Sequence, residues 1–122
     1  MKIYKTRYFH KWAKKALLPN ESLVIAALEL TDGLIDAHLG GNLVKKRIPL
    51  RNKGKRSGFR TIIAYKKGER SIFLFGFEKN EQDNIDKSEE EALKKLAKEF
   101  LILSQHQIDH AVDNGELIEV IL

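Results

Sequence analysis

Two strand-like runs in the middle of the chain, residues 59–66 and 71–79, most constrain its fold. A short connection containing Lys67-Gly68 joins them, and a glycine in such a connection indicates a β-hairpin. The first run is predicted to place Phe59, Thr61, Ile63 and Tyr65 on one face. The second is predicted to be apolar on both faces, with Phe73, Phe75 and Phe77 on one and Ile72 and Leu74 on the other. Such strands belong in the middle of a sheet covered on both faces.

The predicted pairing of this hairpin places basic residues together. If the strands pair across the connection, Arg60 faces a residue between Phe75 and Lys79. Arg60 and Lys79 therefore lie at the same end of the predicted sheet. Residues 43–50 are a third strand-like run, heavily basic, and Pro49 suits an edge strand or a strand end.

Helical periodicity precedes the sheet. Apolar residues in the segment 8–18 recur at helical spacing, and Pro19 is predicted to stop that helix. Asn20 is predicted to cap a second helix that ends at Gly33. The predicted apolar faces consist of Phe9, Trp12, Ala13, Ala16 and Leu17 in the first helix, and Leu23, Ala26, Ala27 and Leu30 in the second.

A third helix follows the sheet. Ser88 and Glu91 are predicted to form its capping box, and its apolar face consists of Leu93, Leu96, Ala97, Phe100 and Leu101. Residues 105–112 are a weaker helix, and residues 116–122 a short extra strand. The prediction is an α+β domain over residues 1–122, with two N-terminal helices, an antiparallel sheet of three to four strands, a C-terminal helix, and residues 104–122 as an extension.

Length and composition exclude several classes of protein. A chain of 122 residues suits one domain with one sizeable core. It has no cysteine, which excludes a disulfide framework and a thiolate zinc site. No apolar run approaches the roughly 20 residues that span a bilayer, and no signal peptide is expected. We therefore expect a cytoplasmic domain with no membrane partner.

The net charge of +5 conceals a strong asymmetry along the chain. Residues 1–79 carry 18 basic and 6 acidic residues, whereas residues 80–122 carry 4 and 11. The segment 45–70 holds 11 basic residues and one acid, Glu69. Such a pattern favours a surface that binds a polyanion, beside an acidic C-terminal part.

The densest basic cluster runs through residues 51–60 and continues after the hairpin at Lys79 and Asn80. Gly54 and Gly58 allow a loop backbone to approach a phosphate that the basic side chains neutralise. Phe77 is the aromatic residue near Lys79 that could stack on a base. The plainer alternatives are a solvated charged loop and a phenylalanine in the core.

These motifs resemble the RelE/HigB-type toxins of bacterial toxin–antitoxin pairs. The resemblance rests on the segments GKRSGFRTIIAYK (54–66) and IFLFGFEKNEQDNI (72–85), in this order between the flanking helices. It covers residues 1 to about 103, and the tail ending in NGELIEVIL is also similar. It implies a small ribonuclease-like fold that cleaves messenger RNA at the ribosomal decoding site without a metal or another cofactor.

The resemblance also implies roles for individual residues. Arg60 stabilises the phosphate, Lys79 matches the basic residue at the end of the next strand, and Lys53 belongs to an alternating basic pair. The implied catalytic residues are Lys53, Lys55, Arg60 and Lys79. The implied RNA-binding residues are Arg51, Arg56, Lys45, Lys46, Phe77 and Asn80.

One position departs from the family pattern. Some members carry a tyrosine or histidine where this chain has Ile85, which can neither stack on RNA nor transfer a proton. No histidine lies near the cluster in sequence, and His106 with His110 offers two metal ligands without a third. We therefore predict no metal site, and the general base stays open.

The resemblance implies a cognate antitoxin, of the helix-turn-helix (HigA-like) type, through which alone the toxin would reach promoter DNA. Two other functions stay open. The first is a poison of DNA gyrase, as in the related ParE-type toxins, which also lack the aromatic or histidine base. The second is a non-catalytic basic module that binds nucleic acid.

Overall fold

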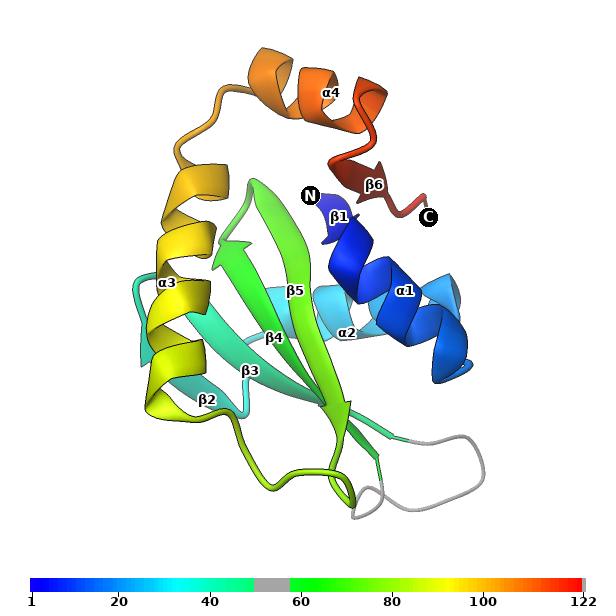
Figure 1. The fold of residues 1–122 in the computed structure, drawn as a ribbon. Coiled ribbons are helices and arrows are strands. Elements are labelled where there is room, and N and C mark those ends of the chain that lie inside the picture. Colours follow the sequence, from blue (N-terminus) through cyan, green and yellow to red (C-terminus); the bar gives the residue numbers. More distant parts are fainter. Residues whose placement is uncertain (50–57, 122) are drawn as a thin grey trace.

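A computed structural model describes residues 1–49 and 58–121, and its fold is α+β (Figure 1). The elements in chain order are β1 (Lys2–Thr6), α1 (Arg7–Lys15), α2 (Asn20–Thr31), β2 (Ala37–Gly40), β3 (Leu43–Ile48), β4 (Phe59–Lys66), β5 (Arg70–Glu78), α3 (Lys87–Leu101), α4 (Gln105–Asp113) and β6 (Leu117–Glu119).

The described strands form one mixed sheet in the order β2-β3-β4-β5-β1-β6. β1 runs parallel to β5, and the other neighbouring strands pair antiparallel. The predicted antiparallel sheet of three to four strands was therefore too small and lacked its parallel pair. β1 and β2 were not predicted because each is short, at five and four residues, and carries too few alternating positions to show a strand period.

Helices cover the two faces of the sheet with separate apolar clusters. Side chains of α1 and α2 pack on one face, with the fully buried Phe9, Leu23 and Phe73 at its centre. Side chains of α3 and α4 pack on the other face, around the fully buried Ile62 and Ile72. Burial on both faces explains why the middle of each central strand, residues 62–64 of β4 and 72–75 of β5, is apolar on both sides.

The central hairpin forms as predicted. Gly68 adopts a φ of +79° in the turn between β4 and β5, a conformation that glycine takes without strain. Arg60 faces Phe77, within the predicted interval. One detail of the face assignment was wrong: the register shifts by one residue where Ile62 faces Phe75 and Ile63 faces Phe73.

The shift places Leu74 as an extra residue, so that Phe73 packs with α1 and α2 while Phe75 and Phe77 lie on the opposite face. A β-bulge of this kind reverses the alternation beyond it. Phe75 and Phe77 consequently share a face with Arg60.

Three predicted helix ends are corrected. α1 ends at Lys15, and Leu17 has a φ of +58° and is 87% exposed instead of lying in the core. Pro19, not Asn20, is the N-cap of α2, and the Asn20 side chain instead accepts a hydrogen bond from Lys5. The capping box of α3 joins Asp86 and Glu89 instead of Ser88 and Glu91, because the helix begins two residues earlier than predicted, at Lys87.

The C-terminal segment joins the sheet. α4 and β6 occupy the two stretches that were predicted as a weak helix and a strand. β6 pairs with β1, and the backbone N–H of Val120 donates to the carbonyl of Ile3 at 2.8 Å. In the described part of the chain, no helix is long and apolar enough to cross a membrane.

Candidate nucleic-acid interface

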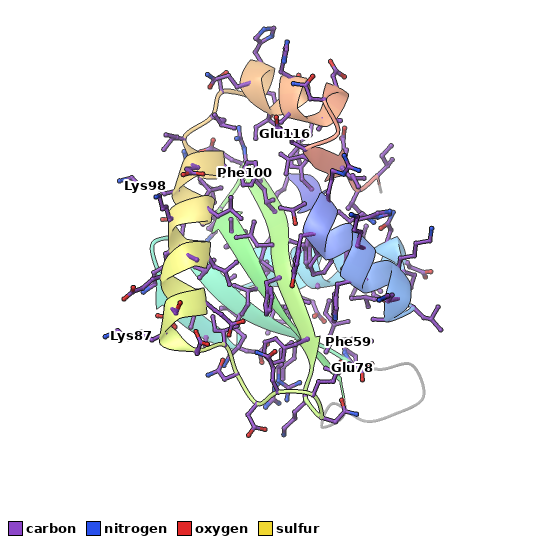
Figure 2. The ribbon with its side chains drawn as sticks, in the orientation of Figure 1. Phe59, Glu78, Lys87, Lys98, Phe100 and Glu116 are labelled. Atoms are coloured by element: carbon purple, nitrogen blue, oxygen red, sulfur yellow. The ribbon has the colours of Figure 1, made fainter. Side chains whose placement is uncertain are left out.

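A row of three side chains crosses the sheet near the start of β4. Arg47 on β3 faces Arg60 on β4, and Arg60 faces Phe77 on β5. Residues directly opposite each other on neighbouring strands project from the same face, so the two guanidinium groups lie on the face that α3 packs against. The neighbouring pair of residues on these two strands is Phe59 and Glu78, which Figure 2 labels.

Arg60 is buried without full hydrogen bonding. The residue is 6% exposed, and its Nη1 has no hydrogen-bond partner among the described residues. Burial lowers the pKa of the Arg60 guanidinium, as does the positive charge of Arg47, while Asp36 acts in the opposite direction. Arginine nevertheless stays protonated at neutral pH. The site therefore holds a cation with an N–H donor that no described residue accepts from. A phosphate oxygen could accept a hydrogen bond from such a donor.

Arg47 is a residue that the sequence interpretation missed. Its side chain is 48% exposed, and its Nε lies 4.0 Å from the Asp36 carboxylate, at the outer limit of an ion pair. The backbone N–H of Arg47 also donates to Asp36, at 2.7 Å. Only the pairing of β3 with β4 reveals that Arg47 faces Arg60. The sequence does not define that register, because ten residues separate Ile48 from Phe59.

Lys79 and Asn80 lie in the turn that follows β5, and both are exposed. The backbone N–H of Lys79 donates to the carbonyl of Gly58 at 3.4 Å. The backbone of Lys79 therefore lies beside Gly58, two residues before Arg60 in the sequence. The structure brings Lys79 to the end of the sheet at which the sequence predicted it.

Gly58 has a packing role, and its predicted approach to a phosphate stays a prediction. A Cβ on Gly58 would lie 2.5 Å from the carbonyl oxygen of Ile48 and 3.0 Å from Cα of Pro49. The missing side chain therefore allows the end of β3 to lie close against the start of β4.

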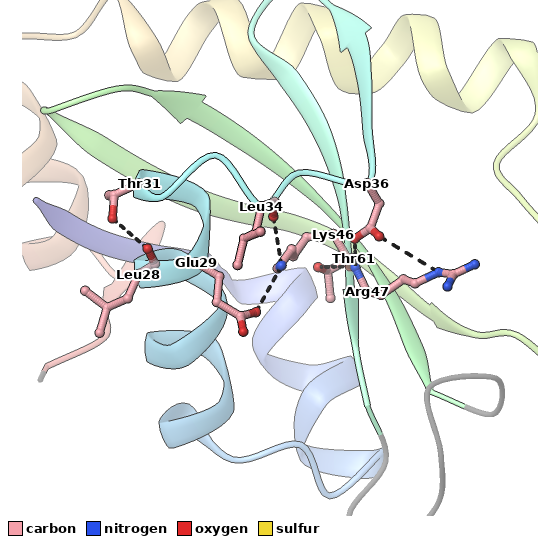
Figure 3. A network of polar contacts seen from close by, with 8 residues as sticks. All are labelled: Leu28, Glu29, Thr31, Leu34, Asp36, Lys46, Arg47 and Thr61. Carbon is pink, nitrogen blue, oxygen red and sulfur yellow. Dashed lines mark hydrogen bonds and ion pairs between the residues drawn. The ribbon is translucent and has the colours of Figure 1, made fainter.

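Lys45 and Lys46 point to opposite faces. Lys45 faces Ile62, on the same side as the arginine row, and is partly exposed. Lys46 is 6% exposed on the α2 face, where its Nζ lies 3.0 Å from Glu29 and donates to the carbonyl of Leu34 at 2.8 Å (Figure 3). The structure does not bring Lys46 to the interface, although the sequence interpretation included it.

Phe77 and Ile85 are core residues, and Phe77 lies directly beside Arg60. Phe77 is 3% exposed and Ile85 is 9% exposed, and both belong to the apolar cluster under α3. Phe77 is therefore a core residue, the second of the two interpretations of the sequence. Its ring is not available to stack on a base in this conformation.

Four of the predicted site residues lie outside the described residues. They are Arg51, Lys53, Lys55 and Arg56. Their predicted roles stay predictions.

The row of Arg47, Arg60 and Phe77 contains no histidine. His106 and His110 are exposed on α4, with ring centroids 6.3 Å apart. Among the described residues, no group of three histidine, aspartate or glutamate side chains is arranged to hold a metal ion. The described part of the candidate interface consists of cationic side chains, the Asp36 carboxylate beside Arg47, a buried aromatic ring and backbone groups.

Comparison with known proteins identifies the class of the chain. Residues 1–120 match the family described as "RelE toxin of RelE / RelB toxin-antitoxin system". The chain belongs to this family. It is therefore a toxin of a toxin–antitoxin system, and family membership implies a cognate antitoxin as its partner. No curated protein matches the chain at a significant level.

Proposed function

We propose that this RelE-family toxin cleaves messenger RNA on the ribosome, with the Arg47–Arg60 row as its phosphate-binding face. The buried Arg60, whose Nη1 has no partner among the described residues, is the observation that carries the proposal. A buried polar group without a partner is rare in proteins and is explained when a ligand supplies the missing acceptor.

In the proposed reaction, all the bonds between heavy atoms that form and break belong to the RNA. The ribose 2′-oxygen loses its proton and forms a bond to the adjacent phosphorus, and the bond from phosphorus to the 5′-oxygen breaks. The leaving 5′-oxygen takes up a proton, so the products carry a 2′,3′-cyclic phosphate and a 5′-hydroxyl. Negative charge gathers on the phosphate oxygens in the transition state, where a fixed guanidinium stabilises it.

The residues divide between positioning and proton transfer. Arg60 is held by a central strand and offers a donor whose position is set before the RNA binds. Arg47 adds a second positive charge in the same row, and Lys79 a third at the strand end. Lys53 and Lys55 are proposed to transfer protons, because a lysine crowded by like charges titrates closer to neutral pH.

The antitoxin is proposed to be of the helix-turn-helix type and to cover this basic face with acidic or apolar segments. In that arrangement the antitoxin blocks the same phosphate-binding groups that the messenger RNA uses. Repression of the promoter then belongs to the antitoxin of the complex, and the toxin acts in the cytoplasm.

Inducible expression of the chain tests the proposal. Transcript 5′ ends are mapped after induction, and gyrase supercoiling is assayed in parallel. We expect growth arrest with codon-phased cuts in translated regions, both lost in Arg60→Ala and Lys79→Ala. A Lys46→Ala variant is the matched control, since Lys46 lies on the opposite face.

The alternatives give different results. Growth arrest with intact transcripts and double-strand breaks in DNA would identify a gyrase poison. Growth without arrest would leave a non-catalytic module that binds nucleic acid.

A further inference from the structure

Tyr8 is an exposed aromatic residue beside the proposed interface. The residue is 63% exposed. The other large apolar residues that are exposed in the described part of the chain are aliphatic. It lies in the first turn of α1, directly after β1. The other rings of α1, those of Phe9 and Trp12, pack into the core instead.

The ring of Tyr8 is held in place by Phe75. The two rings are stacked, with centroids 5.8 Å apart and planes 9° from parallel. Phe75 in turn contacts Phe77, with centroids 6.2 Å apart. Phe75 is only partly buried, whereas Phe77 is 3% exposed. The stacked pair therefore brings an orientated, solvent-facing ring to the edge of the sheet.

The register connects this ring to Arg60. Phe77 faces Arg60, and Phe75 faces Ile62, the next position along β4 that projects from the same face. The rings of Phe77, Phe75 and Tyr8 therefore form a continuous row of contacts that begins beside Arg60 and ends at the protein surface. In Figure 1 no helix passes in front of the lower parts of β4 and β5, which lie between α3 and α1.

We propose that Tyr8, supported by Phe75, forms a stacking subsite for a base of the RNA whose phosphate is bound at Arg60. This inference rests on the proposed function. A fixed, exposed ring offers a π-face to any base, and stacking of this kind is tolerant of sequence. The orientation of Tyr8 by Phe75 reduces the entropy lost on binding.

Binding of short single strands tests the subsite. The probes are a 2′-O-methyl oligoadenylate, which lacks the attacking hydroxyl, and a strand of equal length with every base removed. Both carry the same phosphates, so the ratio of their dissociation constants measures the contribution of the bases. Wild type, Tyr8→Ala and Tyr8→Phe are compared, with Ile102→Ala as a matched control because Ile102 is 74% exposed at the end of α3.

We expect the wild type to bind the strand with bases about fivefold or more tightly than the abasic strand. Tyr8→Ala should lose most of this preference, while Tyr8→Phe and Ile102→Ala keep it. An unchanged preference in Tyr8→Ala would overturn the subsite, as would equal binding of both strands by the wild type.

The same assay separates this inference from the proposed function. Arg60→Met is expected to weaken the binding of both strands by a similar factor. If Arg60→Met weakens binding and Tyr8→Ala does not change the preference, the subsite fails and the phosphate-binding face stands. If Arg60→Met binds both strands like the wild type, the phosphate-binding face itself is wrong.

Discussion

Arg60 combines an unfavourable burial with a role in the proposed function. The residue is 6% exposed, beside the like charge of Arg47, and its Nη1 has no partner in the described part of the protein. Burying a charged group without full hydrogen bonding is unfavourable for folding. Such a residue is retained when a ligand needs the unused donor.

Replacing Arg60 with methionine separates the two effects. Arg60→Met removes the charge and keeps an apolar stem of similar length. We expect the free energy of unfolding to rise or to stay within about 1 kcal/mol of wild type, and RNA cleavage to fall about 100-fold or more. Urea denaturation and a cleavage assay measure the two quantities. A loss of more than about 2 kcal/mol would make Arg60 a structural residue.

His10 introduces a dependence of stability on pH. Its Nδ1 is buried without a partner among the described residues. Burial lowers the pKa of His10, and the positive charges of Lys5 and Lys14 lower it further. The unfolded chain then binds a proton at a higher pH than the folded protein does, so stability falls as the pH drops below about 6.5.

The histidine's share of this dependence is measurable. In urea denaturation between pH 5 and pH 8, we expect the loss of stability toward acid to be smaller in His10→Gln than in wild type. His106→Gln, at an exposed position on α4, is the control and should follow the wild-type curve. Identical curves for His10→Gln and wild type would contradict the prediction.

At the scale of elements, two consecutive lysines of β3 project from opposite faces of the sheet. Lys45 projects from the arginine-row face, and Lys46 is paired with Glu29 on the other. We expect Lys45→Met to reduce the salt dependence of RNA binding by about one phosphate contact. Lys46→Met should leave that slope unchanged. Equal effects of the two substitutions would contradict the strand register.

The contact between α1 and β5 depends on a glycine. A Cβ on Gly76 would lie 2.3 Å from the Trp12 ring, so the ring packs directly on the β5 backbone. We expect Gly76→Ala to destabilise the fold by about 1–3 kcal/mol and to shift the emission of Trp12, the single tryptophan of the chain.

Gly68→Ala is the control for Gly76→Ala. Gly68 has open space around it but a φ of +79°, so alanine there costs about 1–2 kcal/mol through backbone strain alone. The emission of Trp12 should not change in this variant. A shift of similar size in both variants would contradict the direct contact.

The elements also show what the sequence could and could not predict. β4, β5 and the apolar face of α3 follow from periodicity, because each spans enough residues for a period to appear. The bulge at Leu74 and the parallel pairing of β1 were missed, since neither leaves a local pattern. Arg47 and Tyr8 were missed for a related reason: both lie beside the proposed interface through pairing or stacking with residues distant in sequence.

At the scale of the whole molecule, the dense basic segment of the sequence does not form one patch. Arg60 is the second residue of β4 and Lys66 is the last, about 20 Å apart at the usual rise per residue. At the far end, Arg70 is buried and donates to the carbonyls of Phe100 and Leu103, while Lys66 pairs with Glu69 at 3.2 Å. Only part of the positive charge therefore lies at the proposed interface.

Cleavage on purified, programmed ribosomes tests the central claim most directly. The wild-type chain is added to messenger RNA with and without ribosomes, and the new 3′ ends are examined for a 2′,3′-cyclic phosphate. We predict cleavage with ribosomes, a rate lower by about 100-fold or more with Arg60→Met, and unchanged cleavage with Lys46→Met. Intact messenger RNA with the wild-type chain, or full cleavage by Arg60→Met, would contradict the account.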